Sequence, residues 1–350
     1  MNAITRRRLV KTICALPFVA GLSGNNNAQG KREFAQLKAG YRERLTNILA
    51  IGQLPYVDIE SSCSSTRIDI DAIALSMDRL NIGLMALSAD IGEGQFKKGV
   101  RFDNLSERLL ANYPDRFIPV GNGGQPPALT EAPDELLNAQ EAEAKNVLLF
   151  GEFEFRHYPS PRQAKRGEMD RDVQIPIDSS TGHRVFSLSE KTGLPFQIHY
   201  EVEDELLAPL EKMLDLYPKA KVIWAHLAQI RYIERSSRYN PAYVEDLIKR
   251  FPNLYFDTAF GDSSSTYPPS KQRHARIWAN DGSLKPEWRD LIVAYPTRFL
   301  SALDLGGDRV NRIDEYDQKH RTFLKRLPIE AQHQVAYRSA WSLLFGEEFA

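Results

Sequence analysis

The chain has 350 residues, 42% hydrophobic and 26% charged, which is enough apolar sequence for a large core. The formal net charge is −1, and the first thirty residues carry four basic side chains and no acid, which leaves −5 on the remainder. A mildly acidic chain without a basic block argues against nucleic-acid binding, because that binding depends on neutralising phosphates. The charge balance therefore indicates that the partner is not a nucleic acid.

Residues 1–30 have the order of an export signal. The segment TRRRLVK places Arg6 and Arg7 ahead of the apolar run TICALPFVAGL, which is too short to span a bilayer as a mature helix. The pattern resembles a twin-arginine (Tat) signal, which implies delivery of the folded protein to the periplasm and no stable membrane association after removal. We expect cleavage near Ala28 and a single domain over residues 31–350.

The rest of the chain alternates short apolar runs with longer amphipathic stretches. Eight candidate strands follow one another, at 55–60, 82–88, 116–121, 146–155, 194–200, 220–227, 253–260 and 297–305. The stretches between them, including 69–81, 104–114, 134–146, 204–218 and 241–252, repeat apolar residues at intervals of three and four and are predicted helices. Several end in Tyr-Pro or Phe-Pro, where proline stops a helix before the next strand.

Eight strand–helix units predict an α/β protein, most simply a (β/α)8 TIM barrel. The alternative is a doubly wound open sheet, which would need a glycine-rich phosphate loop that begins a helix. The nearest segment, GNGGQPP at 121–127, contains prolines that disfavour such a helix start. In a barrel, the long polar segments 156–184 and 261–288 follow strands and would lie at the mouth, either as substrate walls or as insertions without a role.

Polar residues close most of the predicted strands. Because strand ends project toward the mouth of a barrel and buried polar groups need partners, these residues are the candidates for a site. Two histidines end consecutive strands, in FQIHY and IWAHL, and carboxylates end several others. The set contains the residue types that bind metals or act as acids and bases, namely Asp58, Glu60, Glu152, Glu154, His199, His226 and Asp304.

The segments IHY, WAH, NLYFDTAF and FLSALDLGGDR resemble, in order and strand context, the amidohydrolase superfamily. The branch is the amidohydrolase-related one, which includes the aminocarboxymuconate-semialdehyde decarboxylase type, and the resemblance covers roughly residues 50–345. It implies a distorted (β/α)8 barrel with one or two divalent metals, most often zinc, at the mouth. Carried over by position, His199 matches a metal ligand, His226 a ligand or catalytic group, and Asp304 a ligand or a base.

The first strand departs from the family pattern. The family reads Asp-x-His-x-His there, whereas this chain reads Asp58-Ile59-Glu60-Ser61-Ser62, so both histidines are absent. Glu60 can still bind a cation through oxygen, whereas neutral Ser62 is a poor ligand.

Two site chemistries follow from this departure. In the first, Glu60, His199 and Asp304 hold one divalent metal, Zn²⁺ or Mn²⁺, with His226 or Glu152 as a further ligand. In the second no metal binds, and Glu60, Asp304 and His226 form an acid–base set.

The predicted function is hydrolysis of a small-molecule C–O or C–N bond. Asp304 and His226 would be catalytic, and Glu152, Glu154 and Asp58 would bind the substrate. The alternatives are a metal-independent lactonase or decarboxylase, and a non-catalytic barrel that binds small molecules.

Overall fold

The computed structural model describes residues 26–168, 171–260 and 277–349. Most of the predicted export signal therefore lies outside the described residues, as does much of the predicted mouth segment 261–288. The first described helix, α1, spans Asn26–Ala50 and crosses the boundary predicted after residue 30. Among the described helices, none combines the length and apolarity needed to cross a membrane.

The eight predicted strands are all present as parallel strands in the described part of the chain. They lie in two sheets, ordered β1-β2-β3 and β4-β6-β7-β8-β9, with a short extra strand β5 antiparallel to the end of β4. Their bounds are β1 Val57–Cys63, β2 Leu84–Ala89, β3 Phe117–Ile118, β4 Phe150–His157, β5 Val173–Gln174, β6 Phe196–Tyr200, β7 Val222–Trp224, β8 Leu254–Asp257 and β9 Phe299–Leu300.

Backbone hydrogen bonds join the two sheets into a ring. Beyond β3, the Gly121 N–H donates to the Leu149 carbonyl at 2.9 Å, and parallel bridges continue toward β4. On the other side, the Ile59 N–H of β1 donates to the Ser301 carbonyl at 3.0 Å, next to β9. The structure is thus a (β/α)8 barrel with two irregular seams, as predicted, and the open-sheet alternative is wrong.

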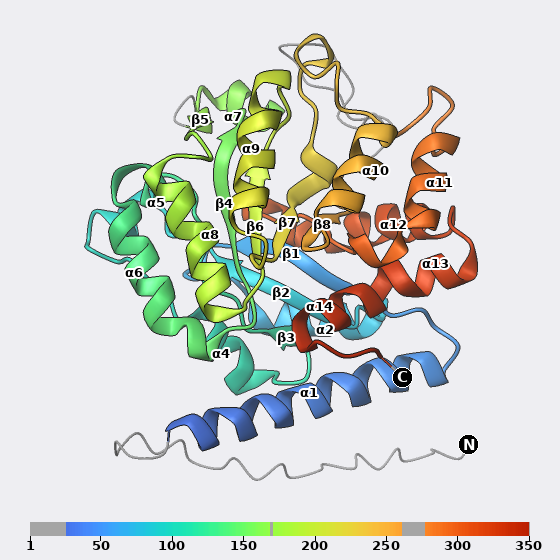
Figure 1. The fold of residues 1–350 in the computed structure, drawn as a ribbon. Coiled ribbons are helices and arrows are strands. Elements are labelled where there is room, and N and C mark those ends of the chain that lie inside the picture. The colour runs from blue at the N-terminus through green and yellow to red at the C-terminus, as the bar shows by residue number, and fades with distance from the viewer. Residues whose placement is uncertain (1–25, 169–170, 261–276, 350) are drawn as a thin grey trace, which may run out of the picture.

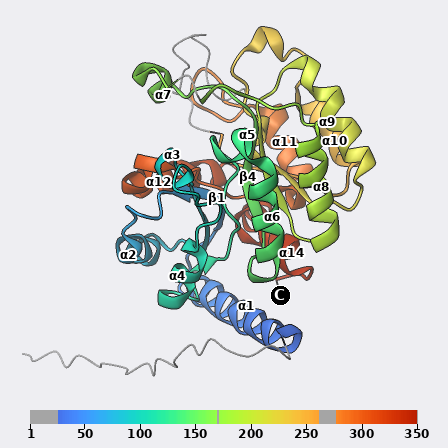
Figure 2. The same cartoon turned by 90° about the vertical axis from the view of Figure 1, so that its left-hand side faces the viewer.

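Helices follow the strands and surround the ring (Figures 1 and 2). Four predicted proline stops are confirmed, because α4, α9, α10 and α11 each end one residue before a Tyr-Pro or Phe-Pro pair. Beyond α1, the helix bounds are α2 Ile70–Leu80, α3 Glu93–Phe96, α4 Leu105–Asn112, α5 Ala128–Glu131, α6 Pro133–Glu143, α7 Pro161–Arg166, α8 Ser180–Thr192, α9 Asp204–Leu216, α10 Pro241–Arg250, α11 Pro286–Ala294, α12 Ile313–Leu324, α13 Ile329–His333 and α14 Ser339–Phe345.

Helix α1 crosses the end of the barrel opposite the mouth (Figure 1). The Tyr41 hydroxyl donates to the carbonyl of Phe117 in β3 at 2.5 Å, and the Arg44 Nε–H donates to the carbonyl of Gly83 at 2.7 Å. Leu45 is fully buried against the same region. The helix therefore closes the bottom of the barrel and leaves the opposite end open.

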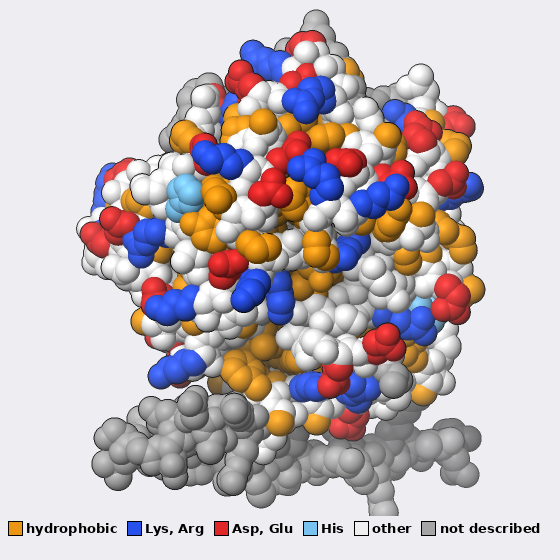
Figure 3. Space-filling view, in the orientation of Figure 1, with side chains coloured by type: hydrophobic (Ala, Val, Ile, Leu, Met, Phe, Trp, Pro, Cys, Tyr) orange, Lys and Arg blue, Asp and Glu red, His pale blue; other side chains and the backbone are white. Residues whose placement is uncertain are grey.

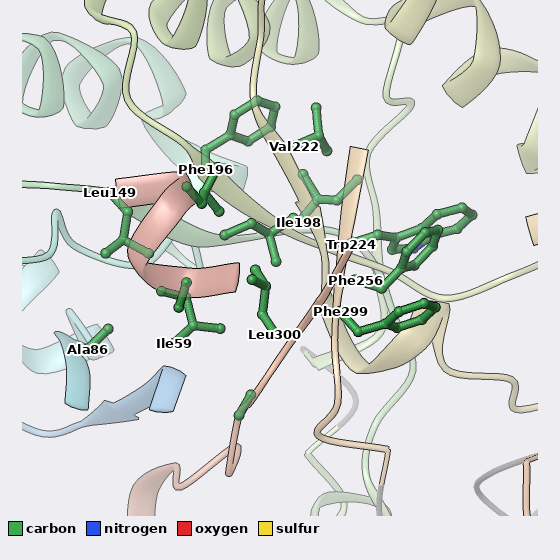
Figure 4. Close-up of a cluster of buried hydrophobic side chains, with 14 of the residues drawn as sticks. Ile59, Ala86, Leu149, Phe196, Ile198, Val222, Trp224, Phe256, Phe299 and Leu300 are labelled. Atoms are coloured by element: carbon green, nitrogen blue, oxygen red, sulfur yellow. The ribbon is translucent and has the colours of Figure 1, made fainter. Parts of the chain in front are cut away.

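The barrel interior is filled with large apolar side chains. Ile59 of β1, Leu149 just before β4, Ile198 of β6 and Leu300 of β9 belong to one cluster, and a stack of aromatic rings that includes Trp224 lies beside it (Figure 4). On the outer face shown in Figure 3, basic and acidic side chains are interspersed. Because the interior is packed with apolar side chains and α1 covers the bottom, the inward-facing polar groups that solvent can reach lie at the mouth.

Candidate metal and catalytic site

A cavity of about 1350 Å³ opens at the carboxyl ends of the strands. Its lining includes six of the seven residues singled out in the sequence: Glu60, Glu152, Glu154, His199, His226 and Asp304. The first strand, β4, β6 and the segments after β7 and β9 supply them, so residues far apart in the chain meet at one end of the barrel.

The strand ends deliver these side chains through special backbone conformations. Gly151 in β4 has φ +122°, and a Cβ there would lie 2.8 Å from the Cβ of Gln197, so the residue before Glu152 must be glycine. After β7, the run from His226 to Gln229 has positive φ throughout. The Asp257 carboxylate anchors that turn by accepting the His226 backbone N–H at 2.8 Å. Non-glycine residues are seldom found in this region, and such strain is concentrated at functional sites.

Three ligand-type atoms converge in the cavity. Glu152 Oε1 lies 2.9 Å from His199 Nδ1 and 3.2 Å from His226 Nε2, and the two ring nitrogens are 3.1 Å apart. The three residues are largely buried, with Glu152 the most exposed of them at 9%. We call Glu152, His199 and His226 the ligand triangle.

The outer nitrogen of His199 has its own partner. His199 Nε2 lies 3.1 Å from the Glu201 carboxylate, which in turn accepts from Arg231 Nε at 2.5 Å. With its proton on Nε2, His199 presents a bare Nδ1 lone pair to Glu152 and His226. A carboxylate and two nitrogens facing one point need a cation or protons between them.

The pKa values of the three triangle residues also indicate that positive charge is required between them. Burial would lower the pKa of His199, but Glu152 and Glu201 outweigh it and raise the pKa to about 10. For His226, burial is likewise outweighed, by Asp304 and Glu152, and the pKa rises to about 10. Burial would raise the pKa of Glu152, but the two histidines hold it well below its usual range. Without a metal, protons occupy the places where a cation would bind.

Glu60 lies beside the triangle. With His226 and Asp257 it forms a second group whose ligand atoms all lie within 4.8 Å of one another. Its Oε2 is buried without a hydrogen-bond partner, as are His226 Nδ1 and Asp257 Oδ2. Burial and the nearby Asp304 and Glu152 carboxylates raise the pKa of Glu60 well above its usual range. Glu60 therefore adjoins the triangle through His226.

The two other candidate aspartates have different surroundings. Asp304 is half-buried at the cavity wall with φ 52°, and its N–H donates to the Glu60 carbonyl at 3.0 Å. It is outside the groups of possible ligands found among the described residues. Asp58, predicted to bind substrate, is fully buried and accepts from the Leu303 N–H at 2.9 Å and the Ser61 hydroxyl at 2.6 Å. We correct that prediction: Asp58 tethers β1 to the segment after β9, beneath the cavity.

The structure adds Arg171 to the site and corrects the place of His157, which we expected on an exposed mouth loop. His157, at the end of β4, is buried with its ring centroid 4.6 Å from that of His199. Arg171, from the segment before β5, reaches Glu154 in the cavity. Strict alternation from Glu152 and Glu154 would select Arg156 rather than His157, and the register shift after Glu154 changes that phase. Nothing local indicates Arg171.

Comparisons with known proteins agree with this architecture. Residues 74–300 match the family model described as Amidohydrolase. Among curated proteins, no relative matches the sequence at a significant level.

Solved structures share the fold at low identity. A 2,6-dihydroxybenzoate decarboxylase complexed with 2,6-dihydroxybenzoate is 13% identical, with a TM-score of 0.51 over 83% of this chain and 98% of that chain. The 2,6-dihydroxybenzoate decarboxylase from Rhizobium has a TM-score of 0.50, with the same identity and coverage. A dihydroxybenzoic acid decarboxylase from Polaromonas sp. JS666 with bound manganese is also 13% identical, with a TM-score of 0.49 over 83% of this chain and 96% of that chain.

Proposed function

The chain belongs to the amidohydrolase family, and on that premise we propose that it hydrolyses a C–O or C–N bond of a small molecule with the help of one divalent metal ion. The observation that carries the proposal is the ligand triangle. Its members are Glu152, His199 and His226, at the mouth of a closed barrel.

The residues present fit a divalent ion. Ligands bound at ~2.0–2.2 Å to one ion lie about 3 Å from each other, as the three triangle atoms do. The Glu201 carboxylate fixes the outer proton of His199, an arrangement that is typical of histidine ligands. The alternative occupants are protons, which compete with the metal for the same lone pairs.

Two imidazoles and one carboxylate form a mixed nitrogen and oxygen set. Such a set suits Zn²⁺, and the additional oxygens of Glu60 and Asp304 nearby also allow Mn²⁺. The ligand set differs from the one expected from the sequence, because Glu152 takes a place that was assigned to Glu60 and Asp304. An ion held there supplies Lewis acidity toward water or a substrate oxygen.

The remaining groups of the cavity would handle protons. The charge of Asp304 raises the pKa of both Glu60 and His226, so its carboxylate lies close to both. This carboxylate would accept the proton of the attacking water. Glu60, whose carboxyl lies near that of Asp304, would donate a proton to the leaving group and then be reprotonated by the proton that Asp304 took from water. Asp257 would keep His226 in position through the 2.8 Å bond to its backbone N–H.

Elemental analysis and mutation test the proposal together. Protein purified without a chelator is expected to contain one equivalent of Zn²⁺ or Mn²⁺ and to hydrolyse members of a panel of lactones, esters and amides. Glu152→Gln is expected to lose both the metal and the activity. The control Glu141→Gln, at an exposed helix position, should keep both.

Full activity of wild-type protein after removal of the metal would instead favour the metal-independent lactonase or decarboxylase. Stoichiometric metal with no turnover of any compound in the panel would favour the binding barrel.

A further inference from the structure

We propose that the cavity contains a subsite for a carboxylate group of the substrate, built on Arg171. The proposal deepens the proposed function and rests on it for the location of the reacting bond beside the ligand triangle. Arg171 precedes β5 in the long segment that follows β4, and its side chain lines the cavity.

The backbone around Arg171 is tied to the barrel at several points. The His157 Nδ1–H donates to the Arg171 carbonyl at 2.7 Å. The next residue, Asp172, is paired with the buried Arg156 at 2.7 Å, and the Ile175 N–H donates to the Phe155 carbonyl at 2.7 Å. These contacts fix the backbone that carries Arg171 before any ligand arrives, so that the segment loses little conformational entropy on binding.

One side of the guanidinium is already engaged. Its Nη2 pairs with the Glu154 carboxylate, and within the described residues this is the single carboxylate that Arg171 contacts directly. A guanidinium carries five N–H donors, and the Arg171 side chain remains 14% exposed at the cavity wall. Donors are therefore left to face a bound molecule.

Arg171 lies close enough to the ligand triangle for the two to interact through their charges. Its guanidinium experiences the charges of Glu152, in the ligand triangle, and of Asp90. Burial lowers the pKa of His157, and the charges of His199, Arg171 and Arg231 lower it further, so a neutral ring contacts His199. This wall presents positive charge next to an otherwise acidic site.

That arrangement selects the ligand by charge and shape. A planar guanidinium fork binds a carboxylate through parallel hydrogen bonds, and an ammonium group would be repelled from the same wall. Aromatic side chains line another part of the cavity, among them Phe260 and Phe323, whose ring centroids are 4.9 Å apart. We therefore expect a substrate with an anionic carboxylate and an apolar body.

Benzoate and its neutral counterpart benzamide are suitable probes, with binding to the metal-loaded protein measured by calorimetry. Arg171→Gln is expected to weaken benzoate binding about 10- to 100-fold, the range for a charge-assisted hydrogen bond, and to leave benzamide unchanged. The control Arg184→Gln removes an arginine of α8 that pairs with Asp134 and is not part of the cavity lining, and it should change neither affinity.

Removal of Arg171 alone leaves Glu154 buried without its cation, so the double variant Arg171→Gln/Glu154→Gln provides a second measurement with the buried charge also removed. It should show the same selective loss of benzoate. Unchanged benzoate binding in both variants, or no benzoate binding by the wild-type protein, overturns the subsite.

Glu152→Gln separates this inference from the proposed function. Loss of benzoate binding in Glu152→Gln but not in Arg171→Gln would place the carboxylate on the metal, which overturns the subsite and leaves the metal site intact. A selective loss in Arg171→Gln from protein that contains no metal would support the subsite and refute the proposed metal-assisted hydrolysis.

Discussion

Glu60 shows how a single residue sets the character of the site. The family resemblance led us to expect a histidine at this position, and the carboxylate found there lies near Asp304 and Glu152. Like charges in a buried site repel, so one carboxyl holds a proton unless a cation is present. Glu60 is the carboxyl that holds this proton, because its pKa is raised and its Oε2 has no hydrogen-bond partner.

The pH dependence of stability tests the protonation of Glu60. Because its pKa is higher in the folded than in the unfolded state, the bound proton stabilises the fold below the unfolded value, near pH 4.5, and this stabilisation is lost as the pH rises through the folded pKa. In chelator-treated protein, Glu60→Gln should remove this loss and raise the free energy of unfolding at pH 8 by on the order of 1–2 kcal/mol. Urea unfolding at pH 5 and pH 8 measures the difference.

The exposed Glu330 offers a control, because Glu330→Gln should leave the pH dependence as it is in wild type. Parallel pH profiles for wild type and Glu60→Gln would show that Glu60 is ionised in the folded protein.

Among the elements, strand β4 contributes most to the site. It carries Glu152, Glu154 and His157, and its first bulge brings Gly151 against Gln197 of β6. Close approach of these two backbones lets Glu152 and His199 meet at 2.9 Å. The register of β4 with β6 pairs Glu154 with His199, so the position of one strand sets the position of the site residues on the other.

Gly151→Ala tests this close approach. The added Cβ would meet Gln197 at 2.8 Å in a backbone conformation with φ +122°, so we expect a loss of about 3 kcal/mol or more of stability and reduced metal content. Gly167→Ala is the matched control, since that glycine has φ +73° with nothing within 4 Å of its Cβ position. It should cost about 1 kcal/mol by denaturant unfolding. Equal losses in the two variants would rule out a special role for the β4–β6 contact.

At the scale of the whole molecule, α1 completes the barrel. It packs on the strand ends at the bottom and meets the C-terminal region, where Lys38 and Arg42 pair with Glu347 and Arg42 lies over the Trp341 ring. The two ends of the described chain thus hold each other at the end opposite the site (Figure 2). We infer that α1 belongs to the folded domain.

Leu45→Ala should destabilise the whole barrel by about 2–5 kcal/mol, because Leu45 is fully buried beneath Gly83 and its removal leaves a cavity. Leu75 of α2 is 66% exposed, and Leu75→Ala should change stability by less than about 0.5 kcal/mol. Thermal unfolding monitored by circular dichroism compares them. A small effect of Leu45→Ala would mean that α1 is dispensable for the fold.

We propose from residues 1–30 that the protein is exported to the periplasm by a twin-arginine signal. Replacement of Arg6 and Arg7 by lysine should leave the protein in the cytoplasm, because the twin-arginine pattern would be lost. Fractionation of cells that express the two forms measures this, with retained metal content and unfolding temperature as the check that folding is intact. Equal amounts of both forms in the periplasm would contradict the proposal.

The amino-acid sequence by itself determined the repeating architecture. Apolar runs, amphipathic stretches and prolines are local signals, so all eight strands and the ends of four helices could be predicted. Its polar strand ends also indicated the cavity, since parallel strands bring their carboxyl ends to one edge.

Tertiary structure decided how those residues are used. Glu152 rather than Glu60 completes the ligand triangle, because the Gly151–Gln197 contact sets the relative position of β4 and β6. Asp58 became a structural tether because its carboxylate is covered by the Leu303 segment, 245 residues away in the chain. Arg171 reaches the cavity through a segment held by Arg156 and His157. Each outcome depends on contacts between distant segments, which the periodicity of a single chain does not encode.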